Sequence, residues 1–239
     1  MADSVACIDI GHAGGSRKFH CFNNPSSINT SGDVISGKSY PIFDRLGRVR
    51  TIADIGANVG AAAVYFSLYY PEADIWAFEP GADAYRLLCR NAEGSRIRPF
   101  PFGLFNRSRG ASLLMGLHDT VTASIAAGSQ TQAAAEAIEL RDAAEALAGL
   151  EPIDILKIDT EGCERHILAS LGAAALAAKA VYLEFHAEDD RRDFDALFAP
   201  THTLAAARVL APHRGELCYV ARRCWPDYEA DAIRIPLDG

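Results

Sequence analysis

Apolar runs of strand length alternate with amphipathic segments of helical length from about residue 50 onward. The runs that indicate buried strands lie at residues 51–55, 73–78, 97–102, 153–158 and 180–185. The segments with helical spacing lie at residues 59–70, 82–91, 139–148, 163–171 and 190–198. Strands that alternate with helices are joined by right-handed crossovers into a parallel sheet with helices on both faces. We therefore expect an α/β fold built on a doubly wound, mostly parallel sheet.

Further patterns concern the edges of this sheet. Prolines interrupt the run at 97–102, which favours a position near an edge or a bulge. The run at 111–115 indicates a short extra strand, and the pair 202–210 and 216–222 predicts a closing antiparallel hairpin. Sheets of this kind bind their ligands beyond the carboxyl ends of the strands.

Two stretches fall outside the alternating pattern. Residues 1–49 are polar and turn-rich, with short apolar pieces at 5–10 and 34–35, so we expect short strands and loops there. We divide the chain into this small N-terminal extension, a candidate for setting substrate choice, and a main domain over residues 50–239. The small-residue segment 116–137 is either a lid or binding loop, or a surface excursion.

Composition narrows the class of protein. The chain has 239 residues, of which 49% are hydrophobic, and its 31 acidic and 23 basic residues leave a net charge of −8. No Lys/Arg block occurs, so a nucleic-acid or anionic-membrane binder is disfavoured. Neither a signal-type apolar region nor a run of about 18 apolar residues is present, which favours a soluble, cytoplasmic protein. The six cysteines lack zinc-type spacing, and we expect reduced, inert thiols.

The strongest chemical signal is Asp54-Ile55-Gly56-Ala57-Asn58-Val59-Gly60, where the first strand of the main domain turns into a helix. Glycines let a backbone approach a ligand closely, and the helix N-terminus offers free N–H groups. The glycines do not follow the G-x-G-x-x-G pattern of dinucleotide sites, and an acid stands at the strand end. That acid favours a ligand with an ammonium group; a plain strand-to-helix turn is the alternative.

More acids follow neighbouring strands. Glu79 ends the second strand, where a carboxylate can accept two hydrogen bonds from a ribose diol. Asp159 and Glu161 lie just past the strand at 153–158. Acids that converge at one edge repel one another unless a cation lies among them. An organic cation is the interpretation we favour, with no metal; a divalent ion is the rival.

The segments IADIGANVG, WAFEP, DILKIDTEGCE and YLEFH together resemble the FkbM family of S-adenosylmethionine-dependent methyltransferases, over roughly residues 50 to 186. The resemblance implies a Rossmann-like class I methyltransferase fold and S-adenosylmethionine as the cofactor. It also implies O-methylation of a hydroxyl on a sugar, polyketide or other small metabolite. Thr160 departs from the family's usual D-V-E-G, and Cys163 stands where a small residue is common.

Carried over by position, the resemblance assigns the cofactor site. The methionine end would be held by Asp54, Gly56, Ala57, Asn58 and Gly60. The ribose would bind Glu79, flanked by Phe78 or Pro80, and the adenine would lie near Phe102 and Gly103. Asp159 would lie at the methyl group, together with Glu161.

Methyl transfer to a hydroxyl needs a base near the methyl group. The candidates are Asp159, Glu161 and His186; His118 is weaker, and a histidine held only by backbone hydrogen bonds is the alternative for His186. The expected partner is a small-molecule hydroxyl acceptor, with no nucleic acid, no membrane and a homo-oligomer allowed. The competing functions are a non-catalytic binding module, a nicotinamide-dependent oxidoreductase and a nucleic-acid methyltransferase.

Overall fold

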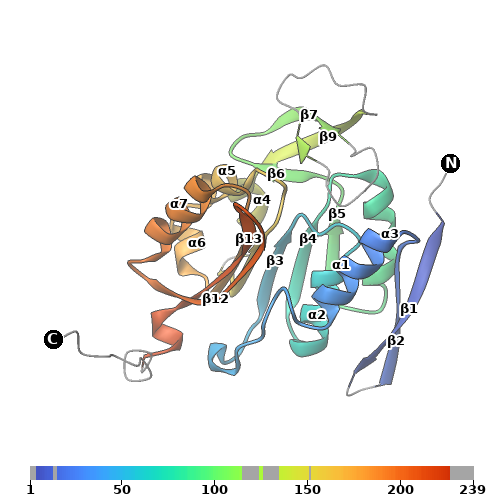
Figure 1. The fold of residues 1–239 in the computed structure, drawn as a ribbon, viewed down its shortest axis with the longest axis horizontal. Coiled ribbons are helices and arrows are strands. Elements are labelled where there is room, and N and C mark those ends of the chain that lie inside the picture. The colour runs from blue at the N-terminus through green and yellow to red at the C-terminus, as the bar shows by residue number, and fades with distance from the viewer. Residues whose placement is uncertain (1–3, 13–14, 115–123, 126–134, 151, 227–239) are drawn as a thin grey trace.

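The computed structural model describes residues 4–12, 15–114, 124–125, 135–150 and 152–226. Its central sheet has seven strands in the order β12-β13-β11-β10-β3-β4-β5 (Figure 1). Their bounds are β3 Thr51–Ile55, β4 Asp74–Phe78, β5 Ile97–Phe100, β10 Ile155–Ile158, β11 Ala180–Phe185, β12 His202–Ala211 and β13 Arg214–Ala221. The first five are mutually parallel, and β13 runs antiparallel to β11 and β12. The doubly wound sheet and the closing hairpin are therefore confirmed.

Helices cover both faces of this sheet. One face carries α2 (Ala61–Tyr69) and α3 (Ala82–Ala92), and the other carries α5 (Glu164–Leu171), α6 (Ala173–Ala177) and α7 (Glu188–Phe198). Successive strand residues alternate between the two cores: Ile52 packs with the first set of helices and Ala53 with the second. Every residue of β10 and β11 is buried, as expected for central strands of a covered parallel sheet.

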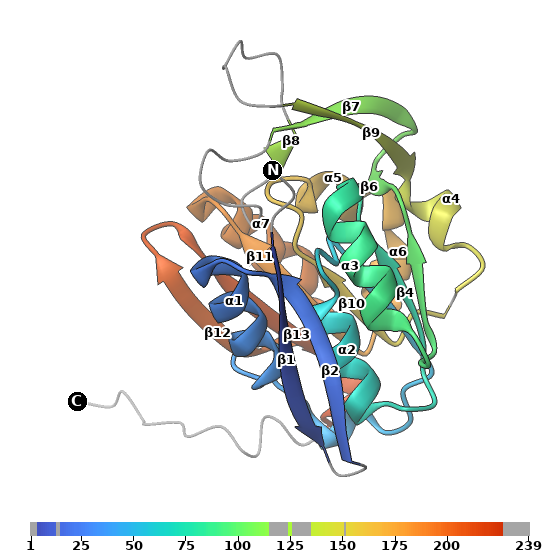
Figure 2. The same ribbon diagram turned by 90° about the vertical axis from the view of Figure 1, so that its right-hand side faces the viewer.

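The N-terminal segment contains more structure than its sequence predicts. A hairpin of β1 (Val5–His12) and β2 (Gly15–Phe22) leads into helix α1 (Pro25–Ile35) and the short 3-10 turn η1 (Asp44–Leu46). The hairpin and α1 lie against α2 and α3 in Figure 2. Asn91 of α3 attaches β2, because its side chain accepts from the His20 N–H and donates to the His20 carbonyl.

The expectation of only strands and loops before residue 50 is thus wrong for α1. Ser, Asn, Thr and Gly in this segment have low helix propensity, which hides the helix. Its start is nevertheless encoded: the Asn24 side chain accepts a hydrogen bond of 2.7 Å from the Ser27 N–H, and Pro25 occupies the first helical turn.

The helix expected over residues 139–148 is also wrong in its first half. Residues Ala135–Asp142 form strand β9, and only Ala143–Leu147 are helical, as α4. Buried Ile138 and Leu140 alternate with more exposed neighbours, which is the period of a strand. The Asp142 side chain then caps α4 by accepting from two N–H groups.

A second, four-stranded sheet, in the order β6-β9-β7-β8, lies beyond the carboxyl end of β5. Its other strands are β6 (Gly103–Phe105), β7 (Arg109–Leu114) and β8 (Ser124–Ile125), so the extra strand expected near 111–115 is present. Most of segment 116–137, where a lid or surface loop is expected, lies outside the described residues. β5 stands at the edge of the central sheet, as its prolines predict.

All six cysteines are free, and Cys163 is at the N-cap of α5 rather than inside the helix. Among the described residues, no helix has the length and apolar character needed to cross a membrane.

Candidate functional site

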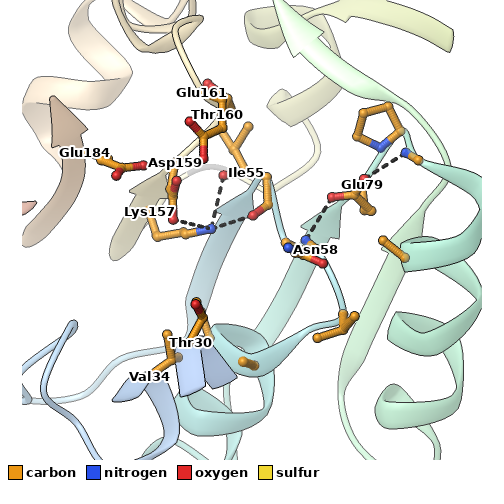
Figure 3. Close-up of a pocket in the computed structure, with 18 of the residues that line it drawn as sticks. Thr30, Val34, Ile55, Asn58, Glu79, Lys157, Asp159, Thr160, Glu161 and Glu184 are labelled. Carbon is orange, nitrogen blue, oxygen red and sulfur yellow. Dashed lines mark hydrogen bonds and ion pairs between the residues drawn. The ribbon is translucent and has the colours of Figure 1, made fainter. Parts of the chain in front are cut away.

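A cavity of about 260 Å³ opens at the carboxyl ends of the parallel strands (Figure 3). The turns after β3, β4 and β10 form its floor, and Glu184 at the end of β11 and Arg214 at the start of β13 form one side. The opposite side comes from strands β6, β7 and β9 of the four-stranded sheet. Helix α1 supplies a further wall through Ser27, Thr30, Ser31 and Val34, which share one helical face.

The structure brings most of the predicted site residues to this cavity. Those that line it are Gly56, Ala57, Asn58, Glu79, Pro80, Gly103, Asp159 and Glu161. The remaining predicted residues are not part of this lining: Asp54, Gly60, Phe78, Phe102 and His186. Phe78 belongs to the core, where its ring stacks on Phe100 at 4.8 Å, and Phe102 packs under the guanidinium of Arg141. His118 lies outside the described residues.

Gly56 is required by the protein's own backbone. Its φ of 76° lies in the left-handed region, and a Cβ at this position would lie 1.8 Å from the carbonyl oxygen of Asp159. The Gly56 and Ala57 N–H groups both donate to the carbonyl of Phe78. The glycine therefore lets the turn after β3 close against the loop after β10, and this contact shapes the cavity floor.

Glu79 is a buried carboxyl group that faces the cavity. Its Oε2 accepts from the Asn58 N–H at 2.8 Å, and its Oε1 accepts from the Gly81 N–H at 2.7 Å. Burial raises the pKa of Glu79 to about 7, despite these hydrogen bonds and the nearby charge of Lys157. Each oxygen retains a lone pair, so the carboxylate can accept further hydrogen bonds from a ligand.

Lys157 supplies the cation that the converging acids require. It lies on β10 opposite Asp54 of β3, and its Nζ is 3.0 Å from Asp54 Oδ1 and 3.8 Å from Asp159 Oδ2. The same group donates to the carbonyl of Gly56 at 2.6 Å. Burial alone would lower the pKa of Lys157, but Asp54 and Asp159 hold it above its ordinary value. Asp54 is fully buried, so the expected ligand ammonium beside Asp54 is replaced by a protein ammonium.

Sequence reasoning passed over Lys157, although a signal was present. A lysine inside the apolar run ILKI, between two strand-end acids, is buried only if it is paired. Tyr40, Glu184 and Arg214 were missed as well. Tyr40 and Arg214 come from distant segments, and only the fold places them beside Asp159 and Glu161. Glu184 lies within the YLEFH motif, two residues before His186.

The second group of acids is linked by hydrogen bonds. The Tyr40 hydroxyl donates to Asp159 Oδ2 at 2.9 Å. Arg214 donates from Nε to Glu184 at 2.7 Å and from its terminal nitrogen to Glu161 at 3.0 Å. Burial and the neighbouring Asp159 raise the pKa of Glu184 to about 10. Burial would also raise the pKa of Asp159, but Lys157 and hydrogen bonds from Glu184 and Tyr40 hold it below its ordinary value.

His186 stands behind these acids. Its ring nitrogens are 3.9 Å from Glu161 and 3.6 Å from both Glu164 and Glu184. Burial lowers the pKa of His186, but Glu164 and Glu161 outweigh it and raise the value overall. Ligand atoms of Glu161, Glu184 and His186 lie within 4.8 Å of one another, a spacing a divalent ion can use. The guanidinium of Arg214 already binds two of these carboxyl groups, so we assign no metal there.

The cavity as a whole is acidic. Its lining contains seven acidic residues and two basic ones, Lys157 and Arg214. Lys157 forms an ion pair with Asp54 and a hydrogen bond with the Gly56 carbonyl, and Arg214 forms ion pairs with Glu161 and Glu184. The excess of carboxyl groups favours a ligand that carries positive charge and hydrogen-bond donors.

Comparisons with known proteins identify the family. Residues 54–204 match the methyltransferase FkbM domain. The hexuronic acid methyltransferase AglP of Haloferax volcanii is 27% identical over 154 residues, 61% of this chain and 60% of that protein. The methyltransferase sdnD of Sordaria araneosa is 28% identical over 151 residues, 49% of this chain and 58% of that protein. The chain thus spans about 60% of the length of the curated relatives it matches.

Solved structures agree in fold. Methanococcus jannaschii fibrillarin, a pre-rRNA processing protein, superposes with a TM-score of 0.52 at 13% identity, over 90% of this chain and 82% of that one. Aeropyrum pernix fibrillarin bound to S-adenosylmethionine gives 0.51 at 14% identity, over 90% and 83%. The chain therefore belongs to the FkbM methyltransferase family, with a class I methyltransferase fold and S-adenosylmethionine as its cofactor.

Proposed function

We propose that this protein transfers the methyl group of S-adenosylmethionine to a hydroxyl group of a small metabolite, such as a sugar, a polyketide or another natural product. The observation that carries the proposal is the acidic cavity, which gathers four separate sequence motifs at the carboxyl edge of the sheet. A sulfonium-bearing cofactor is positively charged, and the surplus of carboxyl groups matches that charge.

The residues present fit the cofactor. Glu79 has a lone pair left on each oxygen, which suits a ribose diol, and the turn at Gly56, Ala57 and Asn58 borders the same cavity. Gly103 and Pro80 border the same cavity, and we place the adenine ring beside them. When bound, the cofactor supplies an electrophilic methyl group on sulfur. Asp159 lies where its negative charge would face the sulfonium.

We place the acceptor on the side of Asp159 that faces α1. Thr30 and Tyr40 line the cavity there, and both come from the N-terminal extension, outside the family match. Residues 1–49 are thus the segment we propose to set substrate choice. Neutral hydroxyl acceptors suit this wall of hydroxyl and carboxyl groups. The net charge of −8 favours a small molecule over nucleic acid.

Glu161 is the base that we favour for the acceptor hydroxyl. Glu161 lines the cavity, and burial raises its pKa even though the charge of Arg214 acts in the opposite direction. A raised pKa makes the carboxylate a stronger base. Asp159 has a lowered pKa, so it is the weaker base and acts through its charge. His186 contacts Glu161 and Glu184 from behind and acts through them.

The test begins with binding. S-adenosylhomocysteine should bind with roughly micromolar affinity, whereas NAD should not bind; the opposite result would identify a nicotinamide enzyme. Transfer of labelled methyl groups is then screened against hydroxylated metabolites. Cofactor binding without transfer to any acceptor class would support a non-catalytic module.

Two variants and a chelator separate the remaining alternatives. Glu161→Gln should reduce transfer by about 10²–10⁴-fold with little change in cofactor affinity. His186→Ala should shift the pH profile of transfer, and a profile unchanged between pH 6 and 9 would remove the histidine from the proposal. Activity should survive a chelator, since loss of activity would favour the divalent ion.

We place the reaction in the cytoplasm, which six free cysteines support.

A further inference from the structure

Two carboxyl groups meet in the cavity, the buried one of Glu184 and the partly exposed one of Asp159. Glu184 ends β11 and Asp159 follows the neighbouring strand β10, and the Glu184 carboxyl group points toward Asp159 (Figure 3). The Glu184 side chain is 7% exposed, so water solvates its charge poorly. Two carboxyl groups in contact cannot both ionise at low cost, so a proton shared between them relieves the repulsion.

The surroundings decide which group holds the proton. Asp159 Oδ2 accepts from the Tyr40 hydroxyl and lies 3.8 Å from the Lys157 ammonium, so the negative charge belongs on Asp159. Glu184 faces Asp159, and the charges of Asp159 and Glu161 disfavour a further negative charge on Glu184. Glu216 lies opposite Glu184 on β13.

The remaining charged neighbours of Glu184 do not reverse this order. Arg214 donates to Glu184, but the same guanidinium also neutralises Glu161. His186 is 3.6 Å from Glu184 and equally close to Glu164. Glu216 is in turn 3.6 Å from Arg208. Burial together with Asp159 accounts for the pKa of Glu184 of about 10.

We propose that Glu184 is a positioning residue that carries a proton in the free protein, donates it in a hydrogen bond to Asp159, and releases it to solvent when a sulfonium binds beside Asp159. The inference rests on the cofactor placement given under the proposed function. The positive charge of a sulfonium beside Asp159 favours the ionised form of Glu184, so Glu184 loses its proton. The site therefore gains a negative charge when the positively charged ligand binds. Both ionised carboxylates then hold the sulfonium from the same side.

The two forms of the cofactor provide a matched pair of probes. S-adenosylmethionine carries the sulfonium, whereas S-adenosylhomocysteine has a neutral thioether and shares the ribose, adenine and amino-acid groups. Proton changes at Glu79 occur with both ligands, so they cancel in the difference. The difference in protons released therefore reports on groups near the sulfur.

The experiment is calorimetric titration of the full chain with each ligand, in two buffers of different ionisation enthalpy, from pH 6.5 to pH 8.5. We expect the wild-type protein to release more protons with S-adenosylmethionine, with a difference that grows with pH toward about one proton per site. In Glu184→Gln the difference should vanish, because an amide keeps the size and a hydrogen-bond donor but has no proton to lose. Asp159→Asn should also abolish it, because Glu184 then has no anionic partner and ionises beside Arg214 before the ligand binds.

A control variant identifies the group. His186→Gln should retain the difference, because the imidazole does not hold the proton shared by Glu184 and Asp159. Equal proton release by the two ligands in the wild-type protein, or a difference that persists in Glu184→Gln, overturns the inference. Failure of both ligands to bind the wild-type protein would instead refute the proposed function.

Discussion

At the scale of single residues, Glu79 makes cofactor binding sensitive to pH. Its pKa of about 7 in the free protein means that folding favours the protonated form, so its contribution to stability is lost as pH rises from about 4.5 through 7. A ribose diol needs the ionised form. We therefore expect the affinity for S-adenosylhomocysteine to fall by about tenfold for each pH unit below 7, measured by calorimetric titration.

The matched variant for this prediction is Glu79→Gln. An amide cannot accept from both the Asn58 and Gly81 N–H groups, so binding should weaken by about 10- to 100-fold at pH 8. The remaining affinity should not vary between pH 5.5 and 8. A variant that keeps the wild-type pH dependence would show that another group titrates.

Gly56 provides a second prediction at this scale. Gly56→Ala places a Cβ against the Asp159 carbonyl in a left-handed conformation, so we expect the free energy of unfolding to fall by about 3 kcal/mol. Gly94→Ala is the control: its φ of 69° is similar, but nothing lies within 4 Å of the added atom, and we expect a loss of about 1 kcal/mol. Urea unfolding measures both, and equal losses would show that the close approach of the two loops is unimportant.

At the scale of elements, a buried ion pair joins the neighbouring strands β3 and β10. Lys157→Met leaves Asp54 without its cation, and we expect a loss of about 3–5 kcal/mol in urea unfolding. The double variant Lys157→Met with Asp54→Leu removes both charges and should recover most of that loss. If the double variant were as unstable as the single one, the hydrogen bond from Lys157 to the Gly56 carbonyl would be the main contribution.

The central elements can be read from the sequence because they obey one simple rule. Strands such as β10 and β11 are buried on both faces, so they appear as nearly continuous apolar runs, in which Lys157 and Glu184 are the exceptions. Two elements do not show this pattern. Helix α1 has a polar sequence and packs against α2, and the short alternating strand β9 is followed directly by α4. In both cases tertiary packing overrides local propensity.

Some residues of the candidate site could likewise be predicted from the sequence, and others could not. Residues in the motifs after β3, β4 and β10 could be predicted, because strand order alone brings those turns together. Tyr40 and Arg214 could not, since they reach Asp159 and Glu161 from opposite ends of the chain. The pairing of Lys157 with Asp54 could not be predicted either. Lys157 is a single basic residue in an apolar run, and its position opposite Asp54 depends on the register of β10 against β3.

At the scale of the whole molecule, the net charge of −8 and the acidic cavity predict different salt dependences for the two forms of the cofactor. S-adenosylmethionine has a net positive charge and is attracted by the field of the chain, whereas S-adenosylhomocysteine has no net charge. Salt shortens the screening length to about 10 Å at 0.1 M, so the attraction weakens as salt is added.

We therefore expect the Kd for S-adenosylmethionine to rise by about three- to tenfold between 20 and 500 mM NaCl, because the field that draws the cation to the cavity is progressively screened. The Kd for S-adenosylhomocysteine should change by less than about twofold, and it serves as the control for any effect of salt on the fold. Stopped-flow measurement should locate most of the change in the association rate, since electrostatic steering acts on encounter. Equal salt dependence for the two ligands would mean that pairing of the acids with Lys157 and Arg214 already cancels the field at the cavity mouth.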